Sequence, residues 1–137
     1  MFNSKPFKFG KKSAEELLTL HTDLQKILLE VIKYRDFSIV CGRRNEADQN
    51  KAFAEGKSKL KFPLSKHNSN PSLAVDIAPY PIDWKDIRMF TDLVRFIQGV
   101  SLGKFGIRLR AGVDFNGDWL KNDTFLDYPH LELHSKL

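Results

Sequence analysis

The stretch from Ser65 to Tyr80, SKHNSNPSLAVDIAPY, constrains this chain more than any other part of the sequence. It begins as a loop rich in Ser, Asn and Pro that contains His67, and it continues into an alternating run at 73–78. A period of two predicts a β-strand with one apolar face and one face that carries Asp76 between two alanines. Because aspartate is disfavoured in strands and is costly to bury alone, Asp76 needs a partner, and His67 is a candidate.

A second group of candidate ligands lies near the C-terminus, in the segment DYPHLELH at 127–134. Its last residues alternate as in a strand, and three polar side chains share one face: His130, Glu132 and His134. If this strand lies beside that of Asp76, then His67, Asp76 and His130 converge on one ion. Two imidazoles and one carboxylate around an open position are typical of catalytic zinc, Zn²⁺. Glu132 and His134 are then alternative ligands or supporting groups. The opposing interpretation is that each histidine makes an ordinary surface hydrogen bond.

Two further residues are candidates for hydrolytic chemistry. A zinc hydrolase needs a carboxylate that is not a ligand, to move a proton from water to the leaving amine. Asp127, three residues before His130, is placed for this role, unless it only forms the turn before Pro129. The second candidate is one of the two arginines, Arg43 and Arg44, that follow a predicted strand end, where an arginine can hold a substrate carboxylate or stabilise an oxyanion. The alternative is an ordinary surface or ion-paired arginine.

Cys41 offers a different mechanism. Together with a histidine and an aspartate it would make a cysteine hydrolase, but its context, FSIVC, is that of a buried strand. As the chain has one cysteine, an internal disulfide is excluded and the fold does not depend on an oxidising compartment.

Length and charge narrow the class of protein. The 137 residues fit one domain, 1–137, and the net charge of +5 favours an anionic partner such as a cell-wall polymer or a nucleic acid. The sequence has no apolar run long enough to span a membrane, and its basic N-terminus lacks the apolar centre of a signal peptide. We therefore expect a protein found in the cytoplasm where it is made, without membrane insertion.

The periodicities predict an α+β fold in which about three helices accompany a small, mainly antiparallel sheet. Ser13 and Glu16 form a capping-box pattern before the first apolar-periodic segment, and His21 lies off its apolar stripe and is expected to be exposed. The expected helices are 14–34, 45–56 and one that Asp83 caps and that ends before Gly103. The expected strands are 37–41, 73–78, 107–110 and 130–134, with a loop over 111–128.

Three motifs resemble one known family. They are Ser65-Lys66-His67, Ala74-Val75-Asp76 and Asp127-Tyr128-Pro129-His130, and the similarity extends to Phe7–Lys11, Gly42–Arg44 and Ile82–Trp84. Their combination resembles the phage L-alanyl-D-glutamate endopeptidases, endolysins related to zinc D-alanyl-D-alanine carboxypeptidases. The loop between His67 and Asp76 is two residues longer than the common form and lacks its glycine, which bears on the shape of the cleft.

The resemblance implies a zinc ion bound by His67, Asp76 and His130, with Asp127 as catalytic base and Arg44 as the arginine that contacts substrate. The expected function is hydrolysis of the peptidoglycan stem peptide between L-alanine and D-glutamate. The expected enzyme is a monomer that does not bind nucleic acid and reaches the wall from the host cytoplasm after another protein opens the inner membrane. Two alternatives stay open: a zinc D-alanyl-D-alanine carboxypeptidase, and a basic nucleic-acid-binding domain.

Overall fold

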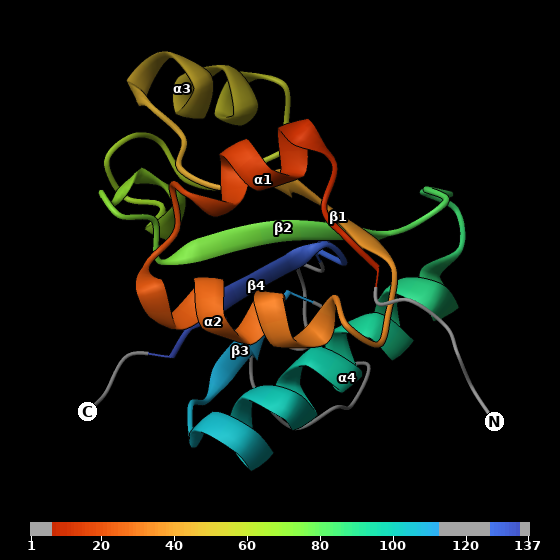
Figure 1. The fold of residues 1–137 in the computed structure, drawn as a ribbon. Helices are drawn as coiled ribbons and strands as arrows, with labels where there is room; N and C mark the ends of the chain where they lie inside the picture. Colours follow the sequence, from red (N-terminus) through yellow and green to blue (C-terminus); the bar gives the residue numbers. More distant parts are fainter. Residues whose placement is uncertain (1–6, 113–126, 135–137) are drawn as a thin grey trace, which may run out of the picture.

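The computed structural model describes residues 7–112 and 127–134 (Figure 1). Within these ranges the order of elements is α1 (Lys11–Leu17), α2 (Thr22–Val31), β1 (Phe37–Cys41), α3 (Glu46–Ala54), the 3-10 helix η1 (Lys66–Asn68), β2 (Ala74–Pro79), α4 (Ile87–Phe105), β3 (Leu109–Ala111) and β4 (His130–Leu133). The predicted α+β class is confirmed. None of the described helices is long and apolar enough to cross a membrane.

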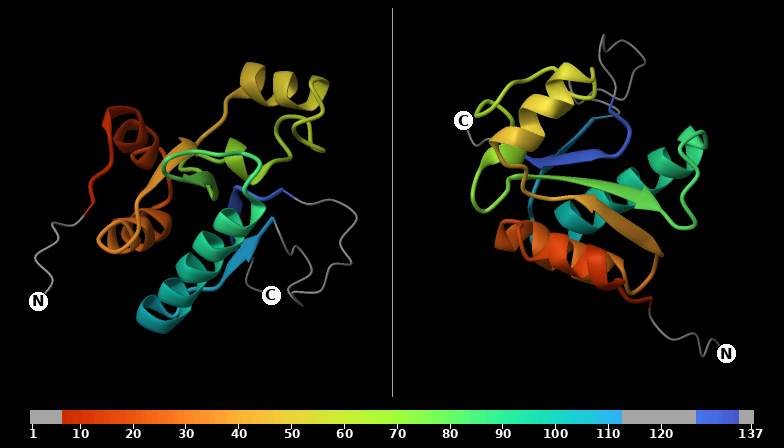
Figure 2. Two further views of the ribbon diagram at one scale, coloured as in Figure 1. Left: turned by 90° about the vertical axis from the view of Figure 1, so that its right-hand side faces the viewer. Right: turned by 90° about the horizontal axis from the view of Figure 1, so that it is seen from above.

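The sheet brings the two alternating segments of the sequence together. Its strand order is β1-β2-β4-β3 and every pairing is antiparallel, so the last strand lies between β2 and β3 (Figures 1 and 2). Asp76 stands opposite His130, and Ala74 stands opposite Glu132. Since directly opposed residues project to the same side of a sheet, this register collects the polar side chains of both strands on one face.

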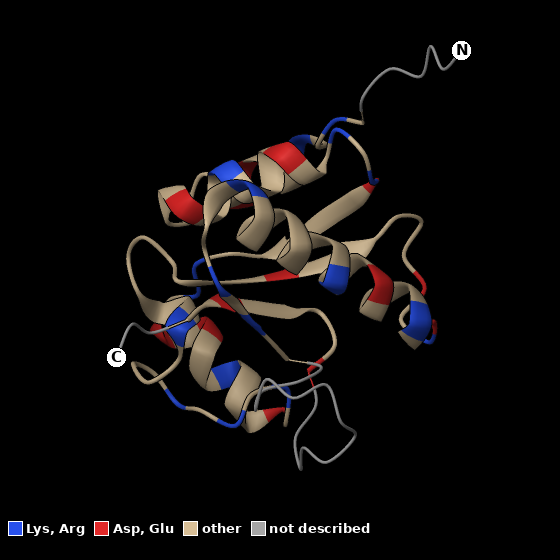
Figure 3. Cartoon of the chain, turned by 90° about the horizontal axis from the view of Figure 1, so that it is seen from below, with Lys and Arg blue, Asp and Glu red and all other residues tan. Residues whose placement is uncertain are grey.

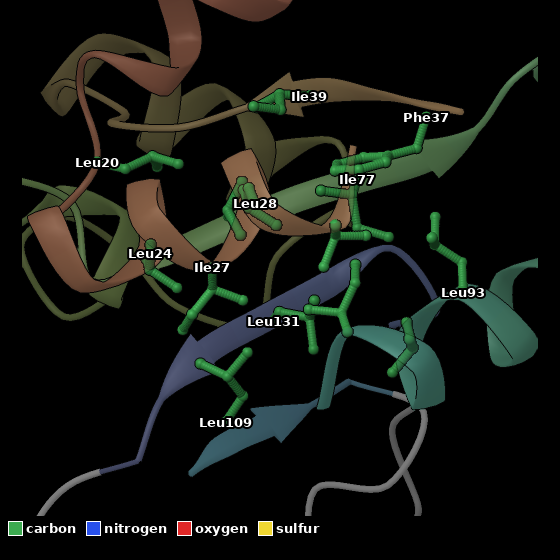
Figure 4. Packing of buried hydrophobic residues seen from close by; sticks show 14 of the residues in the cluster. Leu20, Leu24, Ile27, Leu28, Phe37, Ile39, Ile77, Leu93, Leu109 and Leu131 are labelled. Atoms are coloured by element: carbon green, nitrogen blue, oxygen red, sulfur yellow. The ribbon is translucent and has the colours of Figure 1, made fainter. Parts of the chain in front are cut away.

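The other face of the sheet carries the apolar core. α2 and α4 pack against each other and cover this face, as Figure 2 shows, and their apolar stripes meet the inward residues of the strands (Figure 4). The buried cluster includes Leu24, Ile27, Leu28, Val31, Ile39, Val75, Ile77, Leu93, Val94, Ile97, Leu109 and Leu131. The sheet is therefore anchored from one side, which leaves its polar face available for a site.

The prediction of one helix over 14–34 is wrong, because the chain forms α1 and α2 with a break between them. At the break the backbone bonds to another segment: the Ser72 N–H donates to the Thr19 carbonyl at 2.9 Å, and the His21 N–H donates to the Ser72 carbonyl at 2.8 Å. His21 then begins α2, where its Nδ1 accepts from the Asp23 N–H at 3.0 Å. The His21 side chain is 37% exposed, and its position off the apolar stripe gave no indication of this capping role.

The predicted capping box at Ser13 and Glu16 is also wrong, because both residues lie inside α1. Their side chains accept hydrogen bonds from β1 and the residue after it. The Ile39 N–H donates to the Ser13 hydroxyl at 3.0 Å, and the Gly42 N–H donates to the Glu16 carboxylate at 3.1 Å. The polar pattern that suggested a helix start instead fastens α1 to the edge of the sheet.

Three further boundaries differ from expectation. α4 begins after Asp86, whose carboxylate accepts from the Met89 N–H, whereas Asp83 forms a turn just before it. It continues through Gly103 and ends at Gly106, whose φ of 66° is the left-handed conformation that glycine adopts at low cost. β3 starts two residues later than predicted. Most of the predicted loop at 111–128 lies outside the described residues.

Candidate metal centre and its cleft

Three potential ligand atoms meet on the polar face of the sheet. His67 Nε2 lies 3.3 Å from Asp76 Oδ1 and 3.3 Å from His130 Nδ1, and His130 Nδ1 lies 3.2 Å from Asp76 Oδ1. The two histidines are buried and the Asp76 side chain is 14% exposed. The predicted convergence of these residues is thus present, although they come from η1, β2 and β4.

The donor set fits a divalent metal ion. The three atoms form a triangle in which they lie 3.2–3.3 Å from one another, close enough for a single ion to contact all of them at the usual Zn–N and Zn–O distances of about 2.0–2.2 Å. The other nitrogen of each ring meets an acceptor: His67 Nδ1 lies 2.7 Å from the Gly42 carbonyl, and His130 Nε2 lies 2.8 Å from Glu132 Oε1. These acceptors select the tautomers that turn a lone pair of each ring toward Asp76.

The electrostatics of the site favour positive charge between the rings. Burial alone would lower the pKa of His67, but the adjacent Asp76 carboxylate outweighs it and raises that pKa to about 10. Burial also opposes protonation of His130, yet its hydrogen bonds to Asp76 and Glu132 raise its pKa to about 9. Burial would raise the pKa of Asp76, and the two histidines reverse this and hold it well below the ordinary value. A bound cation supplies the same positive charge that a proton supplies here.

Gly42 orients His67 through the ring nitrogen that faces away from Asp76 and His130. A Cβ at this position would clash with the Thr19 hydroxyl and would lie 2.8 Å from the Glu16 carbonyl, so only glycine lets the end of β1 lie this close to α1. The carbonyl of Gly42 is the acceptor for His67 Nδ1. The close approach of the Gly42 and Glu16 backbones therefore fixes the orientation of the His67 ring, whose Nε2 faces Asp76 and His130.

Glu132 performs the corresponding role for His130. Its Oε1 accepts from the ring at 2.8 Å, and its Oε2 forms an ion pair with Lys66 Nζ at 3.0 Å. Burial would raise the pKa of Glu132, but the hydrogen bonds from His130 and Lys66 lower it to about 2, so the carboxylate is ionised. The structure therefore places Glu132 behind the ring and outside the triangle. His134 is exposed at the end of β4 and is not part of the group.

Asp127 lies at the edge of the triangle and has a half-buried side chain. Its Oδ2 is 3.9 Å from His130 Nδ1. Burial and the nearby Asp76 carboxylate raise the pKa of Asp127 to about 6, which suits a group that exchanges protons near neutral pH. Gly112 holds this segment, because its carbonyl accepts from the Asp127 N–H at 2.8 Å and a Cβ on it would clash with the Asp127 carbonyl.

Arg44 reaches the same site from the segment after β1. Its Nη2 lies 3.5 Å from Asp76 Oδ2, the carboxylate oxygen that is not part of the triangle. Its Nη1 donates to Gln49 Oε1 at 3.0 Å. The neighbouring Arg43 is exposed. The structure thus brings Arg44, and not Arg43, to the candidate ligands.

An open cleft of about 1100 Å³ passes over the site. One part of its wall comes from α3 and the residues after it, where Figure 3 shows several basic residues, and Trp84 lines it as well. Cys41 also lines the cleft, on β1 opposite Asp76. The Cys41 thiol lies 3.6 Å from the Gly42 carbonyl and, after Asp76, contributes to the raised pKa of His67. The two ring nitrogens of His67 nevertheless lie closest to the Gly42 carbonyl and to the Asp76–His130 pair, which favours the metal site over a cysteine nucleophile.

Sequence reasoning missed the polar residues that hold the site from outside. Gln49 and Asn68 are buried, and both contact Arg44. Ser65 and Asn68 form a reciprocal cap around η1: the Ser65 hydroxyl accepts from the His67 N–H, and Asn68 Oδ1 accepts from the Ser65 N–H. The Ser-x-x-Asn spacing around His67 was the one available signal, as it resembles a capping box.

A small α+β fold that presents two imidazoles and two carboxylates at an open cleft has the composition of a catalytic metal centre. The sequence profile of the family described as phage L-alanyl-D-glutamate peptidase matches residues 5–134. The chain is 41% identical over 140 residues to the L-alanyl-D-glutamate peptidase of Escherichia phage T5. The alignment covers 93% of this chain and 98% of that protein. This chain belongs to the phage L-alanyl-D-glutamate peptidase family.

A solved structure agrees at the level of the fold. The crystal structure of the Serratia marcescens L-Ala D-Glu endopeptidase ChiX superposes with a TM-score of 0.72 at 24% sequence identity. The match covers 93% of this chain and 90% of that one. At this identity the likeness establishes a shared fold.

Proposed function

We propose that this chain is a zinc-dependent endolysin that hydrolyses the L-alanyl-D-glutamate bond of the peptidoglycan stem peptide. The observation that carries the proposal is the triangle of His67, Asp76 and His130, with Asp127 beside it and outside it. Membership of the family supports the bond, and the donor set supports the metal.

In this proposal His67 Nε2, Asp76 Oδ1 and His130 Nδ1 hold the zinc ion. Bound there, zinc acts as a Lewis acid toward water and the scissile carbonyl. Asp127 accepts a proton from the attacking water and delivers it to the departing amine of D-glutamate. Burial and the nearby Asp76 carboxylate raise the pKa of Asp127, which favours proton acceptance at this carboxylate.

Arg44 supplies positive charge on the cleft side of Asp76. Its guanidinium stabilises negative charge on the substrate, either the carboxylate of the D-glutamate residue or the oxygen that develops charge during attack. The positively charged chain suits an anionic wall polymer. The enzyme acts as a monomer on the cell wall, after synthesis in the host cytoplasm and opening of the inner membrane by another protein.

The test is digestion of purified peptidoglycan by zinc-loaded protein, with the new termini identified by mass spectrometry. We expect new C-terminal L-alanine and N-terminal D-glutamate, loss of activity after chelation, and recovery when zinc is returned. Release of free D-alanine would instead identify a D-alanyl-D-alanine carboxypeptidase. Activity that survives chelation and is lost on alkylation would identify Cys41 as the nucleophile.

A further inference from the structure

Gln49 is a buried amide at a place where a helix ordinarily buries an apolar side chain. It is 0% exposed, and it is the only buried residue of α3. The rest of the α3 surface is polar or exposed, so this amide is the buried point at which the helix bonds to the residues around it. Burial of an amide is costly unless its donors and acceptor are satisfied.

Every hydrogen-bonding position of the Gln49 amide is used. Its Oε1 accepts from Arg44 Nη1 at 3.0 Å and from Asn68 Nδ2 at 3.1 Å. Its Nε2 donates to the Leu60 carbonyl at 2.6 Å and to the Ser58 hydroxyl at 3.0 Å. The reversed amide would direct N–H at the arginine and oxygen at the Leu60 carbonyl, so the partners fix its orientation.

These bonds connect α3 to three segments around the cleft. Arg44 follows β1, Asn68 is next to the candidate ligand His67, and Ser58 and Leu60 belong to the cleft wall after α3. Arg44 is further held by its backbone, because its N–H donates to the His67 carbonyl at 2.8 Å and its own carbonyl accepts from Asn68 at 3.0 Å. With the backbone and one guanidinium nitrogen fixed, the other nitrogen faces Asp76 Oδ2 at 3.5 Å.

We infer that Gln49 is a positioning residue for Arg44. It sets the direction of the guanidinium in the cleft, and through its other hydrogen bonds it holds the cleft wall at 58–60 in a fixed position relative to Arg44. It makes this contribution through Arg44 and does not touch the substrate. The inference rests on the proposed function, since it assigns to Arg44 a role in the peptidase reaction. A residue that acts only through another has no effect when the other is absent, and this property can be measured.

The experiment is a double-mutant cycle on kcat/KM with the zinc-loaded protein, using Gln49→Met, Arg44→Ala and the double variant. Methionine keeps the length of the side chain and removes its four hydrogen bonds. We expect Gln49→Met to retain zinc and to lower kcat/KM by about 10–100-fold, the scale on which a misplaced catalytic group acts. In the Arg44→Ala background the same change should alter kcat/KM by less than about 2-fold.

The matched control is Gln98→Met. Gln98 is also an amide that bonds a backbone carbonyl, that of Leu109 at 3.0 Å, but this partner belongs to β3 and not to the segments that hold Arg44. This variant should lower Tm and leave kcat/KM unchanged. If Gln49→Met fails to fold, Gln49→Glu replaces it, because a carboxylate keeps an acceptor for Arg44 and Asn68. We expect that variant to retain zinc and more of kcat/KM than Arg44→Ala retains.

The outcomes separate this inference from the proposed function. Wild-type protein that holds zinc but does not cleave the bond would overturn the proposed function and, with it, this inference. Wild-type protein that cleaves, combined with losses for Gln49→Met and Arg44→Ala that multiply in the double variant, would overturn the inference alone. Unfolding of both Gln49 variants would assign the amide a purely structural role.

Discussion

The two faces of the four-stranded sheet are made by alternate residues of the same strands, yet they follow opposite physical rules. Toward α2 and α4, Val75, Ile77 and Leu131 are fully buried, and removal of apolar area from water stabilises the fold by about 25 cal/mol per Å². On the opposite face Asp76 and His130 are also largely buried, but burial of such groups costs free energy unless each is paired. The polar face is therefore organised for a ligand, and the apolar face supplies the stability that this requires.

The largest effect is expected from His67→Ala, Asp76→Ala or His130→Ala, each of which should abolish stoichiometric zinc binding and activity. Each change removes one of three proposed protein ligands. Zinc content after gel filtration and circular dichroism of the same samples test this. His134→Ala is the control, because His134 directly follows β4 but lies outside the triangle. Full zinc occupancy in any of the three variants would exclude that residue as a ligand.

Asp127→Asn should keep the fold and the zinc while lowering kcat by about 10²–10⁴-fold, the usual contribution of a positioned base. Asparagine has nearly the same shape but cannot accept the proton from water. Because the pKa of Asp127 is raised to about 6, wild-type activity should fall as the pH drops through this region and protonates the base. That acidic limb should be missing from the variant. Near-normal kcat with intact zinc would move the base elsewhere, and zinc loss would make Asp127 a ligand.

Leu131→Ala tests the apolar face on the same strand as His130. Leu131 is 0% exposed, and truncation of a buried leucine costs about 2–5 kcal/mol through lost transfer energy and the cavity left behind. Urea unfolding of the metal-free protein measures this loss of stability. Zinc affinity of the folded variant should remain within a few-fold of wild type. A loss of zinc as complete as in His130→Ala would show that the two faces are not separable.

Glu132→Gln is expected to have the smallest effect, a decrease in zinc affinity of about 10-fold, at the lower end of the range for residues that orient a metal-binding histidine. Glutamine keeps an acceptor for His130 Nε2 but loses the charge that strengthens this bond. Competition with a chromophoric chelator at fixed pH gives the ratio of the zinc affinities of the variant and the wild type. Glu55→Gln removes a carboxylate from the cleft wall without touching His130 and serves as the control. Equal affinities for Glu132→Gln and wild type would contradict the orienting role.

Local patterns were sufficient where a residue's environment depends on its immediate neighbours. Alternation around Asp76 and around His130 predicted two strands, and both strands are present close to the expected bounds. Asn45 was recognised as the start of α3, and its side chain does accept from the Asp48 N–H at 2.8 Å. The same local logic failed at Ser13 and at the break between α1 and α2, because the partners that decide those positions, Ile39 and Ser72, are distant in the chain.

The sequence by itself determined the chemical types of the candidate site: two imidazoles, two carboxylates and an arginine, each on a segment of recognisable local form. Only the tertiary structure decided their arrangement. Strand register placed Asp76 opposite His130, the close approach at Gly42 oriented His67, and Glu132 selected the tautomer of His130. It also decided that Gln49, whose residue type carries no catalytic signal, holds Arg44 in the cleft. The physical reason is that a hydrogen bond between distant segments tolerates a change of only a few tenths of an ångström in its donor–acceptor distance. Such precise distances exist only once the sheet and the helices have packed.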